Sequence, residues 1–210
     1  MKKFLILTDL DSTFEEFQPG KNEFYYFEKF VQNFEKELEV EVKIHFISGT
    51  NKEDLEKRLN FFKTNYPKIY EKIEYAILSH GKKYNKMLEQ TGRCETDKAS
   101  YAKADGVQHI IKDYGKFSLA GVCYMGDDLT DISAFETVRF YSKQFDLGAY
   151  ALAPRSRRAY DHIKNHIDIY SDKPRILGCV ENLEKMKQKI QQTNIQQEVK
   201  FEAKDITRIL

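Results

Sequence analysis

Two aspartates stand directly after the first apolar run of the sequence. The run is Phe4–Thr8, and Asp9 and Asp11 follow it two residues apart. If the chain stays extended there, both carboxylates face the same side. Two carboxylates so close repel each other unless a cation or a proton lies between them. The alternative interpretation is a turn or a helix N-cap, where aspartate is also favoured.

A second acidic turn follows a later apolar run. Leu119–Met125 leads into Gly126, and Asp127, Asp128 and Asp131 come next. Four or five carboxylates at one edge of a sheet need a hard cation, and oxygen ligands favour Mg²⁺. These turns contain neither histidine nor cysteine, which disfavours zinc. A capped helix start, with Asp127 or Asp128 as the cap, is the alternative, and both interpretations can hold together.

Hydroxyl and glycine residues follow two further apolar runs. They are Ser48, Gly49 and Thr50 after Val42–Ile47, and His80 and Gly81 after Tyr75–Ser79. A hydroxyl and free backbone N–H groups at a helix N-terminus bind phosphate. A Ser-Gly-Thr sequence taken alone is more typical of a plain helix cap, so the anion-site interpretation depends on the acidic turns nearby.

Apolar runs of strand length alternate with helical patterns along the chain. The predicted strands are Phe4–Thr8, Val42–Ile47, Tyr75–Ser79, Leu119–Met125, Val138–Ser142, Tyr150–Ala153 and Ile167–Tyr170. The predicted helices include residues 24–34 and 55–62 and cover 98–114, 129–136, 156–165 and 180–192. Continuously apolar strands are typical of a parallel sheet that is covered on both faces. The pattern predicts a doubly wound α/β fold whose ligands bind at the carboxyl ends of the strands.

Together these residues resemble the motifs of the haloacid dehalogenase superfamily of phosphohydrolases. Its first motif, Asp-x-Asp-x-Thr/Val after a hydrophobic strand, matches residues 9–13. Its second, a Ser or Thr that closes a strand, matches Ser48, and its acidic turn matches residues 126–131. The lysine that the family carries upstream of that turn matches Lys103 best, with Lys98 as the rival.

The resemblance implies a Rossmann-like core and a covalent phosphoryl transfer. Asp9 would be the nucleophile that forms an aspartyl phosphate, and Asp11 would protonate the leaving oxygen and then activate water. Ser48 and Lys103 would bind the phosphoryl oxygens, and Lys103 would also hold Asp9 ionised. Mg²⁺ would be held by Asp9, the Asp11 backbone carbonyl and Asp127, with support from Asp128 or Asp131. Further phosphate-binding positions are expected at Leu10, Gly49, Thr50, His80 and Gly81.

The narrower resemblance is to the sugar-phosphatase branches of the superfamily. The acidic turn looks like that of trehalose-phosphate phosphatases, although Ile132 and Thr50 replace a Glu and an Arg of those enzymes. Only about residues 82–97 are left for a cap, which predicts a reduced cap or a simple flap. The expected substrate is a sugar phosphate or a related small metabolite. The alternatives are a phosphomutase, a phosphatase of a larger phosphorylated substrate, and a catalytically silent binding module.

Composition excludes several other classes of protein. The 210 residues include 34 Lys and Arg against 33 Asp and Glu, a balance that argues against a nucleic-acid partner. No apolar stretch is long enough for a membrane span, and the N-terminal apolar run is too short for a signal peptide. A cytoplasmic location is therefore expected, with the three cysteines as free thiols.

The predicted organisation is a core over residues 1–192 and a C-terminal tail over residues 193–210. The polar, weakly alternating pattern of the tail leaves three alternatives open: a frayed end, an edge strand or the contact of a homodimer.

Overall fold

The computed structural model describes residues 1–16, 18, 20–78, 81–93, 102–156 and 159–206, with the backbone alone at residue 102 and residues 195–206. Its strands are β1 (Lys3–Thr8), β2 (Glu41–Ile47), β3 (Ile73–Ile77), β4 (Lys82–Asn85), β5 (Gln90–Arg93), β6 (Leu119–Met125), β7 (Ala149–Ala153) and β8 (Ile169–Tyr170). They form one sheet in the order β5-β4-β3-β2-β1-β6-β7-β8. The strands from β3 to β8 in this order run parallel, whereas β4 and β5 are antiparallel to their neighbours.

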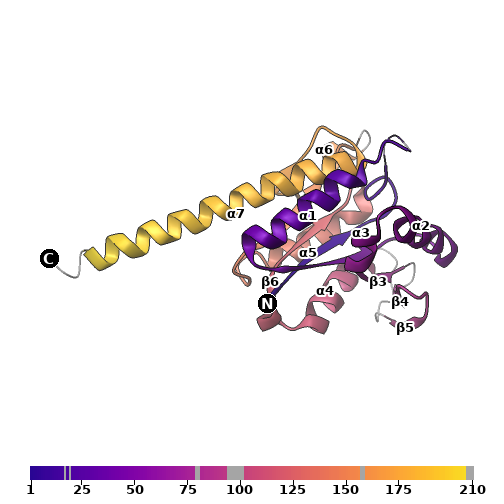
Figure 1. Ribbon diagram of the computed structural model, residues 1–210, viewed down its shortest axis with the longest axis horizontal. Helices are drawn as coiled ribbons and strands as arrows, with labels where there is room; N and C mark the ends of the chain where they lie inside the picture. The colour runs from indigo at the N-terminus through magenta and orange to yellow at the C-terminus, as the bar shows by residue number, and fades with distance from the viewer. Residues whose placement is uncertain (17, 19, 79–80, 94–101, 157–158, 207–210) are drawn as a thin grey trace.

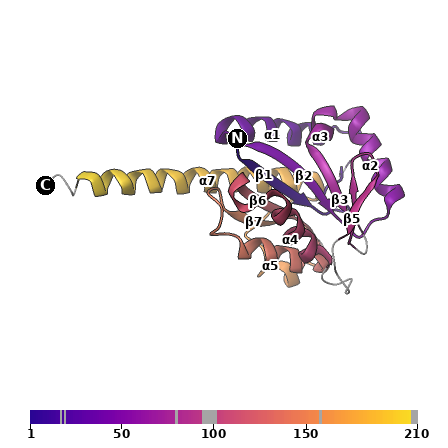
Figure 2. The same ribbon diagram turned by 90° about the horizontal axis from the view of Figure 1, so that it is seen from below.

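Helices cover both faces of this sheet (Figures 1 and 2). They are α1 (Phe24–Leu38), α2 (Lys52–Asn65), α3 (Pro67–Lys72), α4 (Ala102–Tyr114), α5 (Ile132–Phe140), α6 (Tyr160–Ile163) and α7 (Arg175–Ile206), with 3-10 turns at Lys116–Ser118 and Leu129–Asp131. Two hydrophobic clusters separate the faces, one with α1, α2, α3 and α7 and the other with α4, α5 and α6. Neighbouring residues of β1 alternate between the clusters, Phe4 in the first and Leu5 in the second. The predicted doubly wound α/β fold is confirmed.

One predicted strand is wrong. Residues 138–142, expected as a strand, hold the end of helix α5 and the turn that follows it. The helix buries Ala134, Phe135 and Val138, which share one face, while Phe140 is exposed. The apolar residues at the start of 138–142 therefore continue the helical pattern of α5, in which only every third or fourth residue contacts the sheet.

The helix predicted over 180–192 is longer at both ends. It begins at Arg175 and continues to Ile206, so helical backbone replaces the first part of the expected tail. Figure 1 shows its C-terminal part projecting beyond the rest of the molecule. The helix predicted over 156–165 is confined to Tyr160–Ile163 in the described residues. No helix in the described part of the chain is both long and apolar enough to cross a membrane.

The segment expected to form a reduced cap holds a β-hairpin. Strands β4 and β5 pair with each other, and β4 pairs with β3, so the hairpin extends the main sheet. Of the segment predicted as a cap or flap, residues 82–93 hold this hairpin, and residues 94–97 lie outside the described residues.

The loop after β1 is anchored by an aromatic side chain. Phe14 is buried, and its ring meets the rings of Phe24 and Phe27 edge to face at centroid distances of 5.1 and 4.9 Å. The rings of Phe46 and Phe62 also surround Phe14, at centroid distances of 5.7 and 5.6 Å. Helix α1 is therefore held against the same loop that carries the aspartates of the first motif.

Truncating this anchor should cost much of the stability. We expect Phe14→Ala to lower the free energy of unfolding by about 3–5 kcal/mol, because it empties a close-packed aromatic site. Urea unfolding measures the loss. Phe117→Ala is the matched control, since Phe117 is 93% exposed and its loss should change stability by less than about 0.5 kcal/mol. Equal losses in the two variants would contradict the packing argument.

Candidate active site

The first aspartate of the site is fixed by the sheet. Strand β1 ends at Thr8, and the Asp9 backbone N–H donates to the Met125 carbonyl at 2.9 Å, which continues the pairing with β6. The chain then turns back, with Ser12 at a φ of 58° and the Phe14 N–H bonded to the Leu10 carbonyl. Asp9 is thereby buried at the carboxyl edge of the sheet, where the topology predicts a ligand site.

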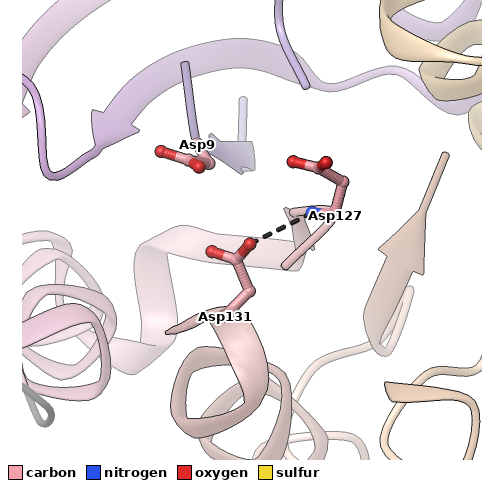
Figure 3. Close-up of side chains that lie close together, drawn as sticks. All are labelled: Asp9, Asp127 and Asp131. Carbon is pink, nitrogen blue, oxygen red and sulfur yellow. Dashed lines mark hydrogen bonds between the residues drawn. The ribbon is translucent and has the colours of Figure 1, made fainter. Parts of the chain in front are cut away.

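Three carboxylates converge at this edge. Asp9 follows β1, Asp127 follows β6, and Asp131 ends the 3-10 turn beyond it; all three side chains point toward a common space (Figure 3). One carboxylate oxygen from each lies within 4.8 Å of the other two. This arrangement could hold a metal ion. Its oxygen-only ligand set suits a hard cation.

Asp131 organises the acidic turn through four hydrogen bonds. Its Oδ2 accepts from the backbone N–H groups of Asp127 and Asp128, each at 3.0 Å. Its Oδ1 accepts from the Tyr124 hydroxyl at 2.6 Å and from Lys103 Nζ at 2.5 Å. A fully buried carboxylate needs such partners, because it has no water around it. The turn is closely packed around this group.

Gly126 is required by that packing. A Cβ at this position would lie 2.3 Å from Cγ and 2.5 Å from Oδ2 of Asp131. Any side chain at position 126 would therefore displace the carboxylate that holds the turn together.

Lys103 supplies the positive charge of the site. It lies in the first turn of α4, and its Nζ is 3.2 Å from Asp9 Oδ2 as well as bonded to Asp131. Burial alone would lower the pKa of Lys103, but the Asp131 and Asp9 carboxylates outweigh burial and raise it. Lys103 is therefore a permanent cation between two carboxylates. The rival Lys98 lies outside the described residues.

Burial, together with the negative charge of neighbouring carboxylates, raises the pKa of two carboxyl groups. Burial, with the Asp131 charge second, raises the pKa of Asp9 to about 7, against the lowering effects of Lys103 and Ser48. Burial also raises the pKa of Asp127 to about 6, although a hydrogen bond from the Thr13 hydroxyl at 2.8 Å opposes the shift. Without a further cation the site therefore holds protons that ordinary aspartates lose.

These pKa values predict how stability depends on pH. The folded pKa values of about 7 for Asp9 and about 6 for Asp127 lie above the ordinary aspartate value of 3.8. Between these pH values the metal-free folded state therefore binds more protons than the unfolded state. The free energy of unfolding should thus fall as pH rises from about 4 to about 7. A bound divalent cation replaces those protons, so its stabilising effect should be larger at about pH 8 than at about pH 5.

Thermal unfolding with EDTA or with Mg²⁺ at both pH values measures this effect. Asp9→Asn is the control, because it removes one of the two titrating carboxyl groups and should flatten the pH dependence. An increase in melting temperature with Mg²⁺ that is the same at both pH values would contradict the prediction.

Some of the predicted anion-binding residues lie around Asp9. Ser48 is buried at the end of β2, its hydroxyl lowers the pKa of Asp9, and the Thr50 N–H donates to its Oγ at 3.3 Å. The backbone of Leu10 is hydrogen-bonded to Asp9 and also lowers its pKa. Gly49 is exposed in the same β2–α2 turn.

The turn after β3 is described only in part. Gly81 has a φ of 73° and donates its N–H to the Leu78 carbonyl at 3.0 Å, which forms the turn into β4. His80, predicted beside it, lies outside the described residues.

Two predicted site aspartates stand apart from the group of three. Asp128 is exposed and caps the following turn, with its Oδ1 accepting from the Leu129 N–H at 2.6 Å. The Asp11 side chain is exposed, and its Oδ1 is 2.6 Å from Nη2 of Arg58 in α2.

Sequence reasoning missed Tyr124 and Arg58 and assigned no role to Thr13. Thr13 carried a signal, since it occupies the last position of the first motif. Tyr124 carried a weak one, as a hydroxyl-bearing ring inside an otherwise apolar strand. Arg58 carried none, because a charged residue on an amphipathic helix is ordinarily a solvated one.

One buried atom tests whether the site fits a cation. Asp9 Oδ1 is buried without a hydrogen-bond partner among the described residues. An unpaired buried carboxylate oxygen is costly, and a metal ion held between Asp9 and Asp127, beside Asp131, would satisfy it. The residues present therefore fit a divalent cation.

Comparison with known proteins adds evidence about the fold. No protein-family model and no curated protein sequence matches the chain. Among solved structures, it is similar to a haloacid dehalogenase-like hydrolase from Bacillus subtilis, with a TM-score of 0.54 at 12% identity over 87% of this chain and 88% of the other. A protein assigned as a UDP-N-acetylglucosamine 2-epimerase from Listeria monocytogenes matches over 81% of this chain and 39% of its own, at 16% identity and a TM-score of 0.40, too low to carry an argument. The chain thus has the fold of the haloacid dehalogenase-like hydrolases.

Proposed function

We propose that this protein is a Mg²⁺-dependent phosphomonoester hydrolase that works through an aspartyl phosphate on Asp9. The observation that carries the proposal is the state of the Asp9 carboxylate. One oxygen lies 3.2 Å from the Lys103 ammonium, while the other is buried without a hydrogen-bond partner in the described part of the chain. A nucleophilic carboxylate needs such an arrangement, with one oxygen held and its charge balanced nearby.

Two balanced steps make up the proposed reaction. A carboxylate oxygen of Asp9 bonds to phosphorus, the bond from phosphorus to the leaving oxygen breaks, and Asp11 gives that oxygen a proton. Water then attacks the phosphorus of the aspartyl phosphate and gives a proton to Asp11. The bond between phosphorus and Asp9 breaks, inorganic phosphate leaves, and the Asp9 carboxylate is restored.

The neighbouring side chains would stabilise the transferring phosphoryl group. The Lys103 ammonium and the Ser48 hydroxyl both act on Asp9 and would bind the phosphoryl oxygens. Asp9, Asp127 and the Asp11 backbone carbonyl would hold Mg²⁺, which when bound offsets the repulsion between the carboxylate and the phosphate. Because Asp131 already accepts four hydrogen bonds, we assign it the support of Lys103 and the acidic turn.

Hydrolysis is favoured over transfer to a second substrate. Transfer requires that the aspartyl phosphate be shielded from water, usually by a cap. In the described residues between β2 and α4, the strands β3, β4 and β5 join the main sheet and so do not form a separate cap.

The proposed substrate is a sugar phosphate or a related small phosphorylated metabolite.

Release of nitrophenol from an aryl phosphate tests the proposal. Wild-type protein should hydrolyse the ester with Mg²⁺ and lose activity in EDTA, and a panel of sugar phosphates then ranks the substrates by kcat/KM. Binding of Mg²⁺ without turnover of any aryl or sugar phosphate would overturn the proposal in favour of a silent binding module.

A further inference from the structure

An arginine outside every predicted motif contacts the second aspartate of the first motif. Arg58 lies in the second turn of α2, and Figures 1 and 2 show this helix toward the end of the molecule to which the parallel strands point. Its Nη2 is 2.6 Å from Oδ1 of Asp11. The Arg58 side chain is 23% exposed and the Asp11 side chain 58%. The guanidinium therefore lies against the protein, while the carboxylate stays open to the solvent.

The position of Arg58 is set by the core. Helix α2 buries Leu55, Leu59 and Phe62, and the side chain of Asn51 caps its first turn by accepting from the Asp54 N–H at 2.9 Å. A planar guanidinium on such a fixed helix can hold a carboxylate in one orientation. Without such a contact, an exposed aspartate on a loop would change rotamer freely, and its carboxyl group would seldom be oriented for proton transfer.

The contact engages one oxygen of Asp11 and leaves the other available. Oδ1 accepts from Arg58, whereas Oδ2 has no hydrogen-bond partner among the described residues. We propose that Arg58 is the positioning residue of the reaction and holds Asp11 so that its second oxygen carries the transferred proton. This inference rests on the proposed phosphatase function.

The role predicts a dependence on the leaving group. In the first step the proton moves from Asp11 to the leaving oxygen as the bond from that oxygen to phosphorus breaks. An alkoxide needs this proton, whereas a nitrophenolate leaves without it. Since kcat/KM reports the steps through the first irreversible one, it isolates this proton transfer from the later attack of water.

The test compares kcat/KM for glycerol 2-phosphate and nitrophenyl phosphate, both with Mg²⁺. We expect Arg58→Met to lower the value about 10²-fold for the alkyl ester and less than about threefold for the aryl ester. Arg58→Lys should recover part of the loss, because it restores a cation at the same place. Lys57→Met is the matched control, since Lys57 is an exposed neighbour that pairs with Asp54 at 3.0 Å; both values should stay unchanged.

A double-mutant cycle completes the test. Asp11→Asn should show the same selective loss, and adding Arg58→Met to it should cost nothing more, because both changes remove one device. Equal losses on the two esters, or full additivity with Asp11→Asn, would overturn the inference while the phosphatase function stands. A wild type inactive on both esters would overturn the proposed function and this inference with it.

Discussion

Asp9→Asn should abolish hydrolysis of aryl phosphates, with kcat lowered by about 10⁴-fold or more. The asparagine amide is a poor nucleophile, and because it is uncharged it attracts a cation only weakly. The variant should nevertheless fold, since burial already disfavours the ionised form of Asp9 and raises its pKa to about 7. Steady-state kinetics together with thermal unfolding separates the chemical loss from a structural one.

The matched control for this variant is Asp146→Asn. Its carboxylate is 70% exposed and pairs with Lys2 far from the acidic group, so hydrolysis should not change. If Asp9→Asn kept more than a tenth of the wild-type kcat, Asp9 could not be the nucleophile.

Among substitutions in the site, Asp131→Asn should lower the free energy of unfolding the most. An amide cannot accept from all four donors, and its NH₂ group would face either two backbone N–H groups or Tyr124 and Lys103. Removing the charge of a fully buried carboxylate that pairs with Lys103 is expected to cost about 3–5 kcal/mol of unfolding free energy. Because Lys103 loses its anchor, kcat should also fall by about 10²-fold.

Asp128→Asn provides the comparison within the same turn. Asp128 is exposed and caps the turn, and asparagine caps as well as aspartate, so stability and kcat should stay close to wild type. Chemical denaturation and aryl phosphate hydrolysis measure both variants. Equal effects of the two substitutions would contradict the assignment of Asp131 as the organising carboxylate.

The sheet and the place of the site could be predicted from the sequence. Strands β1, β2 and β6 are buried on both faces, so their apolar runs carried a strong signal, and parallel strands bring their carboxyl ends to one edge. The meeting of carboxylates from the turns after β1 and β6 follows from that topology.

Which carboxylates converge could not be predicted. Asp127, Asp128 and Asp131 belong to one turn of the sequence, and only the packing against Gly126 turns Asp131 inward and leaves Asp128 as an exposed cap. The contact between Arg58 and Asp11 depends on the direction in which α2 leaves the sheet. That direction is set by tertiary packing on Phe62 and its aromatic neighbours.

Short apolar segments limited the prediction elsewhere. Residues 138–142 read equally as a strand or as the end of a helix, and the burial of Ala134 and Val138 on one face decides for the helix. The length of α7 was underestimated because its last turns are polar and show no clear period in the sequence.

The most direct test of the account traps the covalent intermediate. Wild-type protein is mixed with substrate and Mg²⁺, quenched in acid and reduced with borohydride, which converts an aspartyl phosphate to homoserine. Mass spectrometry of the peptide that spans β1 then locates the modified residue. The account predicts homoserine at position 9, dependent on both substrate and Mg²⁺. Phosphatase activity without a modified Asp9, or modification at another aspartate, would contradict it.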